Sequence, residues 1–319
     1  MFFFSKKTTI AASGILQGAT DHHSHILPGV DDGVETMDEA LRILATYEAA
    51  GIKTLWLTPH IMEDIPNTPQ KLEARFLELK AAYTGKIVLH LAAEYMIDNH
   101  LRKLLDKLLP ATEGTNTTNN SPSSKREYPQ GEGVEKDSNT ENNCPSSGRG
   151  TSNTGNIAQE VQDNNNSPSS KREYPQGEGV EKKSIAEGVE LLPIGNKGNH
   201  LLVETSYYNP PMRFRETLRQ IKSLGYHPLL AHPERYMYMD NDEYQELHEM
   251  GVKFQLNLPS LCGGYGNTVK KRAQWLLKNG FYDAIGSDTH CEEGAEFLLE
   301  RKFDKQTIGQ VEHLLHNSI

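Results

Sequence analysis

Cysteine is scarce in this sequence, and long hydrophobic runs are missing. The 319 residues include three cysteines, Cys144, Cys262 and Cys291, and no Cys-x-x-Cys pair. Such an odd, sparse set argues against a disulfide framework and against a cysteine-ligated zinc site. No stretch approaches the roughly 18 apolar residues of a membrane span, and the run Phe2-Phe3-Phe4 is too short for a signal peptide. We expect a cytoplasmic protein without stable membrane insertion.

Positive charge and the usual covalent nucleophiles are also lacking. The formal net charge is -10, so we expect no broad basic surface and no nucleic-acid partner. Neither Gly-x-Ser-x-Gly nor Cys-x5-Arg occurs in the chain. A hydrolytic enzyme with this sequence would therefore activate a water molecule instead of a Ser or Cys side chain.

Residues 112–183 differ in composition from the rest of the chain. They are rich in Asn, Ser, Gly, Glu, Thr and Pro, with very few apolar side chains to offset the entropy lost on ordering. Residues 119–136 recur identically as residues 165–182, which makes a duplicated segment of 18 residues. Two polar copies do not make a solenoid. We expect a disordered insert in a single domain made of residues 1–111 and 184–319.

The remaining sequence alternates short apolar runs with amphipathic segments. Strands are predicted at residues 18–21, 54–58, 87–93, 201–204, 228–231, 253–258 and 283–286. Helices are predicted from the Thr36 capping box to residue 50, from Thr68-Pro69 to residue 83, and at residues 214–224, 243–250, 268–279 and 305–317. This alternation predicts an α/β fold with a parallel sheet and external helices, but the periodicity leaves closure into a barrel open.

Histidine and carboxylate residues recur where the predicted strands end. They are His23, His25, His60, Glu94, Glu204, His232, Asp288 and His290, and Asp32 is close enough in sequence to join them. The carboxyl ends of parallel strands meet on one face, so we expect these side chains to share a cavity. A ligand set of imidazole and carboxylate groups, without thiolate, suits manganese, iron or zinc. The alternative, several satisfied core histidines, would bury many polar groups without partners.

Arg235 follows His232 by three residues. Its guanidinium could bind phosphate oxygens and stabilise charge in a transition state. The alternative is an ion pair with a nearby carboxylate. Position alone favours the phosphate role, and with it a metal-dependent phosphoesterase.

Taken in order, these motifs resemble the PHP superfamily, and within it the CpsB/CapC-type metal-dependent bacterial protein-tyrosine phosphatases. The segments that carry the resemblance are Asp21-His22-His23-Ser24-His25-Ile26-Leu27-Pro28-Gly29-Val30-Asp31-Asp32-Gly33, Thr58-Pro59-His60, Ala93-Glu94, Leu202-Val203-Glu204, Leu230-Ala231-His232-Pro233-Glu234-Arg235-Tyr236, Phe254-Gln255-Leu256-Asn257 and Gly286-Ser287-Asp288-Thr289-His290. The resemblance covers the chain from about residue 18 to residue 317, apart from the insert.

The resemblance implies a distorted (β/α)7 TIM-like barrel that holds three divalent metal ions, usually manganese, with iron, cobalt and zinc as further options. One ion would be held by His23, His25, Glu94 and Asp288, a second by Asp32, His60 and His290, and a third by Glu94, Glu204 and His232. Arg235 would be the phosphate-binding arginine. The implied substrate is a phosphotyrosine protein, such as a bacterial tyrosine kinase that regulates capsule or exopolysaccharide synthesis.

Two positions depart from the family pattern. Ile61 stands where many relatives have a second histidine, and Cys291-Glu292-Glu293-Gly294 stands where many carry a segment with another arginine. A second phosphate contact is therefore not expected. Three alternatives stay open at this point: a small-molecule PHP phosphoesterase acting on a histidinol, nucleotide or sugar phosphate, an amidohydrolase, and a regulatory protein that binds metal without catalysis.

Overall fold

Parallel strands form the centre of the protein in the computed structural model, which describes residues 7–109, 190–316 and 319. One sheet has six strands in the order β10 (Ala284–Gly286), β9 (Lys253–Asn257), β8 (His227–Ala231), β7 (His200–Glu204), β6 (Glu94–Met96) and β4 (His60–Ile61). The other has β2 (Thr20–Asp21), β3 (Thr54–Leu57) and β5 (Val88–Leu91). All neighbours within these two sheets are parallel.

The two sheets are joined through the chain and through hydrogen bonds. The stretch that forms β3 continues directly into β4, and β5 continues into β6. On the other side, His22 N donates to Ile285 O at 3.1 Å, and Asp288 N donates to His23 O at 2.8 Å. The backbone after β2 therefore runs beside the backbone of β10. The parallel α/β arrangement predicted from the sequence is confirmed.

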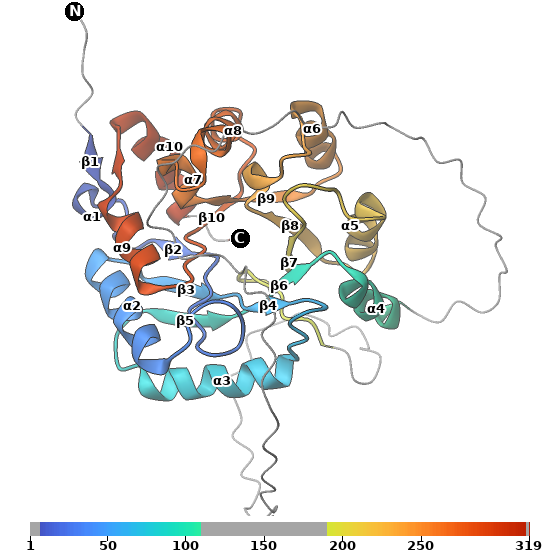
Figure 1. Cartoon of the computed structure of the whole chain (residues 1–319), viewed down its shortest axis with the longest axis horizontal. Coiled ribbons are helices and arrows are strands. Elements are labelled where there is room, and N and C mark those ends of the chain that lie inside the picture. Colours follow the sequence, from blue (N-terminus) through green and yellow to red (C-terminus); the bar gives the residue numbers. More distant parts are fainter. Residues whose placement is uncertain (1–6, 110–189, 317–318) are drawn as a thin grey trace, which may run out of the picture.

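Helices surround these strands on the outside (Figure 1). The longer ones are α2 (Met37–Ala50), α3 (Pro69–Ala82), α4 (Asn99–Leu108), α5 (Phe214–Ser223), α6 (Asn241–Glu249), α8 (Gly266–Lys278), α9 (Glu292–Glu300) and α10 (Lys305–His316). Short elements are α1 (Ile10–Ser13), η1 (Pro233–Arg235), α7 (Leu258–Cys262) and the antiparallel pair β1 (Thr8–Thr9) and β11 (Lys302–Phe303). Every predicted strand and helix is present, and α4 and α9 are the longer elements that were not predicted.

The predicted helix starts at Thr36 and Thr68 are correct. The Thr36 side chain accepts a hydrogen bond from Glu39 N, and Thr68 accepts one from Lys71 N ahead of α3. In a full capping box the Glu39 side chain would also accept a hydrogen bond from Thr36 N. Here the Glu39 carboxylate accepts one from Glu292 N instead. Glu39 thus links the start of α2 to the start of α9.

Both faces of the central strands are buried. Leu230 of β8 packs in the large core between strands and helices, whereas its neighbours Leu229 and Ala231 belong to a second, smaller cluster with Trp56 and Ile319. Successive side chains on a strand point to opposite faces, so the second cluster fills the space on the inner side of the strands. Burial on both faces is typical of parallel sheets covered by helices.

The expected insert, residues 112–183, lies outside the described residues. The strands on either side of it are direct neighbours, since Glu94 of β6 is in register with Leu202 of β7. The elements before and after the insert therefore share one sheet.

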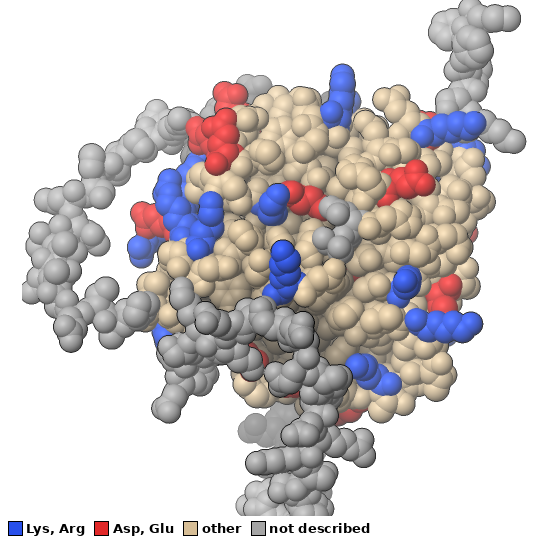
Figure 2. Space-filling view, turned by 180° about the vertical axis from the view of Figure 1, so that it is seen from behind, with Lys and Arg blue, Asp and Glu red and all other residues tan. Residues whose placement is uncertain are grey.

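The face opposite to that seen in Figure 1 carries side chains of both charges. Figure 2 shows Lys and Arg interspersed with Asp and Glu there, without a continuous basic area among the described residues in view. Within the described parts of the chain, no helix has the length and apolar character needed to cross a membrane.

Gly286 ends β10 at the point where the chain after β2 comes closest. A Cβ placed on it would lie 2.4 Å from His23 Cβ and 2.9 Å from His23 N. A side chain at this position therefore cannot be accommodated unless the segment around His23 moves.

We expect Gly286→Ala to lower the free energy of unfolding by about 1–3 kcal/mol through overpacking, and to lower the content of bound divalent metal because His23 is displaced. Gly309→Ala is the matched control. Gly309 lies in α10 with no atom within 4 Å of a Cβ built there, so alanine should raise stability by about 0.5–1 kcal/mol. Denaturant unfolding and elemental analysis measure both effects, and equal behaviour of the two variants would refute the close approach.

Candidate metal centre

The predicted strand-end residues converge at the carboxyl ends of the central strands. His23 and His25 follow β2, His60 begins β4, Glu94 begins β6, Glu204 ends β7, His232 follows β8, and Asp288 and His290 follow β10. Most of these side chains are buried, while His290 is half-buried and Asp32, in the loop after β2, is exposed. The prediction that these residues meet on one face is confirmed by their ion-pair distances.

His23 and His25 have the same arrangement of partners. His23 Nδ1 lies 2.9 Å from Gln255 Oε1, and His25 Nδ1 lies 2.8 Å from Asp31 Oδ2. Both partners are acceptors, so each Nδ1 carries a proton. Each Nε2 then presents a lone pair, and the two Nε2 atoms are only 3.0 Å apart. Two lone pairs at this distance need a proton or a cation between them.

The carboxylate of Glu94 is the centre of the cluster. Its Oε2 lies 3.2 Å from His23 Nε2, 3.3 Å from His25 Nε2 and 3.2 Å from His60 Nδ1. Its Oε1 lies 3.2 Å from His232 Nε2. Neither oxygen has a partner with hydrogen-bond geometry among the described residues, although Glu94 is fully buried. A buried carboxylate is costly unless a cation or hydrogen bonds compensate it.

Three groups of these residues have ligand atoms close enough to bind one ion each. They are His25, Asp32, His60 and His290; His23, His25 and Glu94; and His60, Glu94 and Glu204. The grouping overlaps with the expected ligand sets and differs in detail, because His25 and His60 are each shared by two groups. Asp288 Oδ1 lies 3.5 Å from His23 Nε2, and His232 Nε2 lies 3.7 Å from Glu204 Oε2.

The donor set fits divalent metal ions. Convergent imidazole lone pairs and buried carboxylate oxygens are the ligands of manganese, iron and zinc. The second coordination layer is also present, since a ligating histidine usually donates its other N–H to a carboxylate or carbonyl. The uncompensated oxygens of Glu94 and the close Nε2 pair are the observations that argue for cations here.

The pKa values of the metal-free cluster show the same charge imbalance. Burial alone would lower the pKa of His25, but Asp31 and Glu94 outweigh it and raise that pKa well above its ordinary value. Burial and His25 likewise oppose protonation of His60, yet Glu204 and Glu94 raise its pKa to about 9. Burial would raise the pKa of Glu94, and His23 leads the contacts that hold it well below its ordinary value. Without metal, protons are the cations that neutralise these carboxylates.

Asp31 is a functional residue that sequence reasoning missed. Its buried carboxylate binds His25 Nδ1 and also accepts from His60 N at 3.0 Å and from Gly33 N at 3.1 Å. Burial would raise its pKa, but His25 and His60 lower it to about 2. Asp31 thus orients the ring of His25 and holds the backbone of His60. The signals in the sequence were its place beside Asp32 and within the segment from Asp21 to Gly33 that resembles the family.

Two candidate ligands have a left-handed backbone. The φ angle is 35° at His232 and 55° at Asp288. Residues other than glycine rarely adopt this region, at a cost of about 1–3 kcal/mol each, and such strain is concentrated at functional sites. The turn that follows β8 directs His232 toward Glu94, and the turn that follows β10 directs Asp288 toward His23.

Arg235 is held tightly beside the cluster. Its Nη1 donates to Asp288 Oδ2 at 2.8 Å, and its guanidinium carbon lies 4.3 Å from the ring centre of Tyr207 and 4.2 Å from that of Tyr265. The ion pair that the sequence left as an alternative is therefore formed. It engages one of the five guanidinium N–H donors, so it does not preclude a contact with phosphate. Neither Tyr207 nor Tyr265 carried a recognisable sequence signal.

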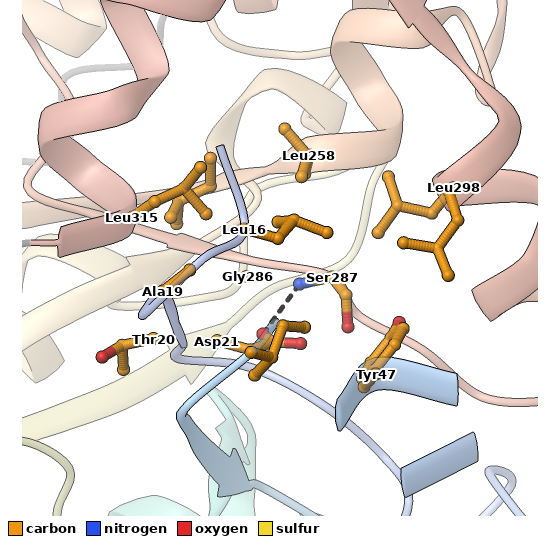
Figure 3. A pocket seen from close by; sticks show the side chains of 13 residues that line it. Leu16, Ala19, Thr20, Asp21, Tyr47, Leu258, Gly286, Ser287, Leu298 and Leu315 are labelled. Carbon is orange, nitrogen blue, oxygen red and sulfur yellow. Dashed lines mark hydrogen bonds between the residues drawn. The ribbon is translucent and has the colours of Figure 1, made fainter. Parts of the chain in front are cut away.

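Asp21 is hydrogen-bonded to Ser287, which lies next to the candidate ligand Asp288 in the chain (Figure 3). Its Oδ1 accepts from Ser287 N at 2.9 Å and from His23 N at 3.1 Å, so it joins β2 to the loop that carries Asp288. The adjoining cavity of about 20 Å³ is apolar and too small for a substrate. His22 points away from the cluster and contacts Ile285 O, and burial lowers its pKa to about 4.

Comparison with known proteins adds a family to this geometry. The family model "Capsular polysaccharide synthesis, CpsB/CapC" matches residues 19–116 and 179–306, which is more than half of the chain. CapC of Staphylococcus aureus is 22% identical over 293 residues, covering 90% of this chain and 83% of CapC. The tyrosine-protein phosphatase CpsB of Streptococcus pneumoniae is 28% identical over 120 residues, covering 35% of this chain and 49% of CpsB.

A solved structure shares the fold. It comes from work on YwqE from Bacillus subtilis and CpsB from Streptococcus pneumoniae, which are described there as metal-dependent tyrosine phosphatases. The TM-score is 0.57 at 17% identity, and the match covers 93% of this chain and 94% of the other.

We expect Asp31→Asn to weaken Mn²⁺ binding about 10–100-fold, as is usual when a partner of a ligating histidine is removed. The amide no longer holds a proton on His25 Nδ1 by charge, so the ring can rotate or change tautomer. A chelator competition titration measures the affinity. Asp242→Asn, at an exposed carboxylate in the first turn of α6, is the control and should bind as the wild type does. Unchanged affinity in Asp31→Asn would show that other contacts orient His25.

Metal binding should release protons and strengthen with pH. In the metal-free protein the pKa of His60 is raised from 6.5 to about 9. Protonated His60 therefore stabilises the folded protein fully below pH 6.5, and this stabilisation is lost as the pH rises through about 9. A bound metal replaces that proton. The rise in melting temperature on adding Mn²⁺ should therefore grow from about pH 6 to about pH 8. Calorimetry in two buffers of different ionisation enthalpy measures the released protons, and zero release at neutral pH would contradict the assignment.

Proposed function

Because this chain belongs to the CpsB/CapC family, we propose that it is a metal-dependent phosphatase that hydrolyses phosphotyrosine in proteins. The observation that carries the proposal is the buried Glu94 carboxylate, surrounded by four imidazoles, with Arg235 held beside the same cluster through Asp288. The family's relatives that bear the name tyrosine-protein phosphatase support the choice of substrate.

The metal ligands in this proposal are His23, His25, Asp32, His60, Glu94, Glu204, His232, Asp288 and His290. We propose three divalent ions, with manganese favoured and iron, cobalt or zinc as alternatives. When bound, the ions supply Lewis-acid activation of water and of the phosphate oxygens. Three such ions more than neutralise the four carboxylates, so the site attracts an anionic phosphate although the chain is acidic overall.

The chain's own residues position the substrate. The Arg235 N–H groups that Asp288 does not engage bind the phosphate oxygens and compensate the charge that grows in the transition state. Tyr207 and Tyr265 hold the guanidinium in place from its two faces. Burial raises the pKa of the Cys262 thiol to about 12, so Cys262 is a poor nucleophile at neutral pH.

The proposal also includes the barrel and the single domain. The backbone hydrogen bonds between the segment after β2 and β10 support closure of the two sheets into a distorted (β/α)7 barrel. The pairing of β6 with β7 supports one domain made of residues 1–111 and 184–319. A bacterial tyrosine kinase of capsule or exopolysaccharide synthesis is the partner that we propose, consistent with the description of the family.

An assay of the purified chain with Mn²⁺ tests the activity directly. We expect turnover of a phosphotyrosine peptide and of a generic aryl phosphate, and loss of both with a chelator. Activity confined to histidinol phosphate would replace the proposal with a small-molecule phosphoesterase. Inactivity with every divalent metal would favour a regulatory metal-binding protein.

Arg235→Ala should lower kcat about 10²–10³-fold, the range seen when a donor to a developing oxyanion is removed, while the metal content stays at the wild-type value. Arg42→Ala is the control, because Arg42 forms an exposed ion pair with Glu292 and has no place in the proposed site. Loss of metal from Arg235→Ala would instead assign the arginine a structural role.

A further inference from the structure

A groove lies between two loops that begin at candidate metal ligands. One loop runs from Glu204 at the end of β7 to α5, and the other runs from His232 after β8 to α6. The groove has a volume of about 330 Å³, within the range of pockets that accept ligands. Its apolar lining consists of Pro210, Pro211, Phe214, Tyr238, Met239 and Leu247.

The groove is directly connected to the metal centre. Tyr238, in its wall, has its hydroxyl 2.7 Å from Thr205 Oγ1, and Thr205 is the residue after Glu204. The two loops are also tied by the hydrogen bond from Met237 N to Tyr207 O at 2.6 Å, and Tyr207 stacks on Arg235. The groove is therefore linked through Thr205 and Tyr207 to residues that border the metal centre.

Apolar side chains outside the groove lining are exposed on these same two loops, and one of them, Met212, lies between the lining residues Pro211 and Arg213. Tyr208 is 74% exposed, Met212 79% and Met237 42%. They make up half of the six large apolar side chains that are exposed on the described parts of the protein. Gathered apolar exposure of this kind marks an interaction surface, and methionine suits a surface that adapts to varied sequences.

The charge in the groove favours an acidic ligand. Arg213 and Arg215 are engaged by Glu216 and Glu246, and Glu243 forms the capping box of α6 with Asp240. Arg219 also lines the groove and is exposed, and within the described ranges no carboxylate lies at ion-pair distance from it. Its positive charge is therefore available to a ligand.

We propose that this groove binds the segment of the protein substrate that flanks its phosphotyrosine, with an apolar side chain in the hollow and an acidic side chain at Arg219. The inference rests on the proposed phosphatase function and deepens it, because it adds selection of an acidic and apolar sequence beside the phosphate. A small aryl phosphate reaches the metal centre without using the groove.

The probe is a fluorescent peptide with a non-hydrolysable phosphotyrosine mimic flanked by Glu and Leu residues, titrated against the manganese-loaded protein. We expect Arg219→Glu and Met212→Ala each to weaken binding about tenfold, the effect of losing one substantial contact, with aryl phosphate turnover unchanged. Replacing Glu by Lys in the peptide should weaken binding to the wild type and restore binding to Arg219→Glu. Loss of a purely structural contact would not produce that reversal.

Lys271→Glu and Leu77→Ala are the matched controls, since both residues are exposed on other helices, α8 and α3. Unchanged peptide affinity in Arg219→Glu and Met212→Ala, or an equal loss of aryl phosphate turnover, would overturn the proposal. A change in the solution mass of Met212→Ala would do the same by assigning the groove to a second copy of the chain. If the wild type hydrolyses no aryl phosphate, the phosphatase proposal fails, while the peptide affinities still decide the role of the groove.

Discussion

The rest of the structure depends on one electrostatic constraint. Imidazole nitrogens and carboxylate oxygens, which are hydrogen-bond acceptors, are buried close together around Glu94. Four imidazoles and several carboxylates from six strand ends meet in one buried cluster. Hydrogen bonds within the protein do not neutralise this cluster, because the Nδ1 protons of His23 and His25 are directed away from it. Positive charge must come from outside the covalent chain, as protons or as metal ions, and the two compete for the same lone pairs.

The framework around the cluster accepts local strain to keep the ligands in place. Positive φ at His232 and Asp288, the close approach at Gly286 and the buried Asp21 all lie within a few residues of a candidate ligand. Each would be unfavourable in an ordinary core. Together they fix side chains that the polar cluster alone would drive apart, and the parallel sheet supplies the rigidity for this.

Much of the fold could be predicted because its signals are local. Alternating apolar runs located the strands, and threonine caps located α2 and α3. Helix α4 was missed because it borders the polar insert, and α9 because its acidic start resembles a loop. The candidate ligands were predictable since strand ends meet by topology. The roles of four supporting residues could not be predicted, because each depends on which way a side chain turns in the folded protein. These residues are Asp31, Gln255, Tyr207 and Tyr265.

The direct pairing of β6 with β7 also has a kinetic consequence. The candidate ligands from His23 to Glu94 precede the long insert, and those from Glu204 to His290 follow it. The group of His60, Glu94 and Glu204 therefore cannot form until the two parts of the chain have met. Closing so long a connection slows folding and costs entropy that grows only slowly with its length. The two groups that contain His60 are therefore completed only when the segments on either side of the insert have met, and an ion bound there would link these segments and slow their separation.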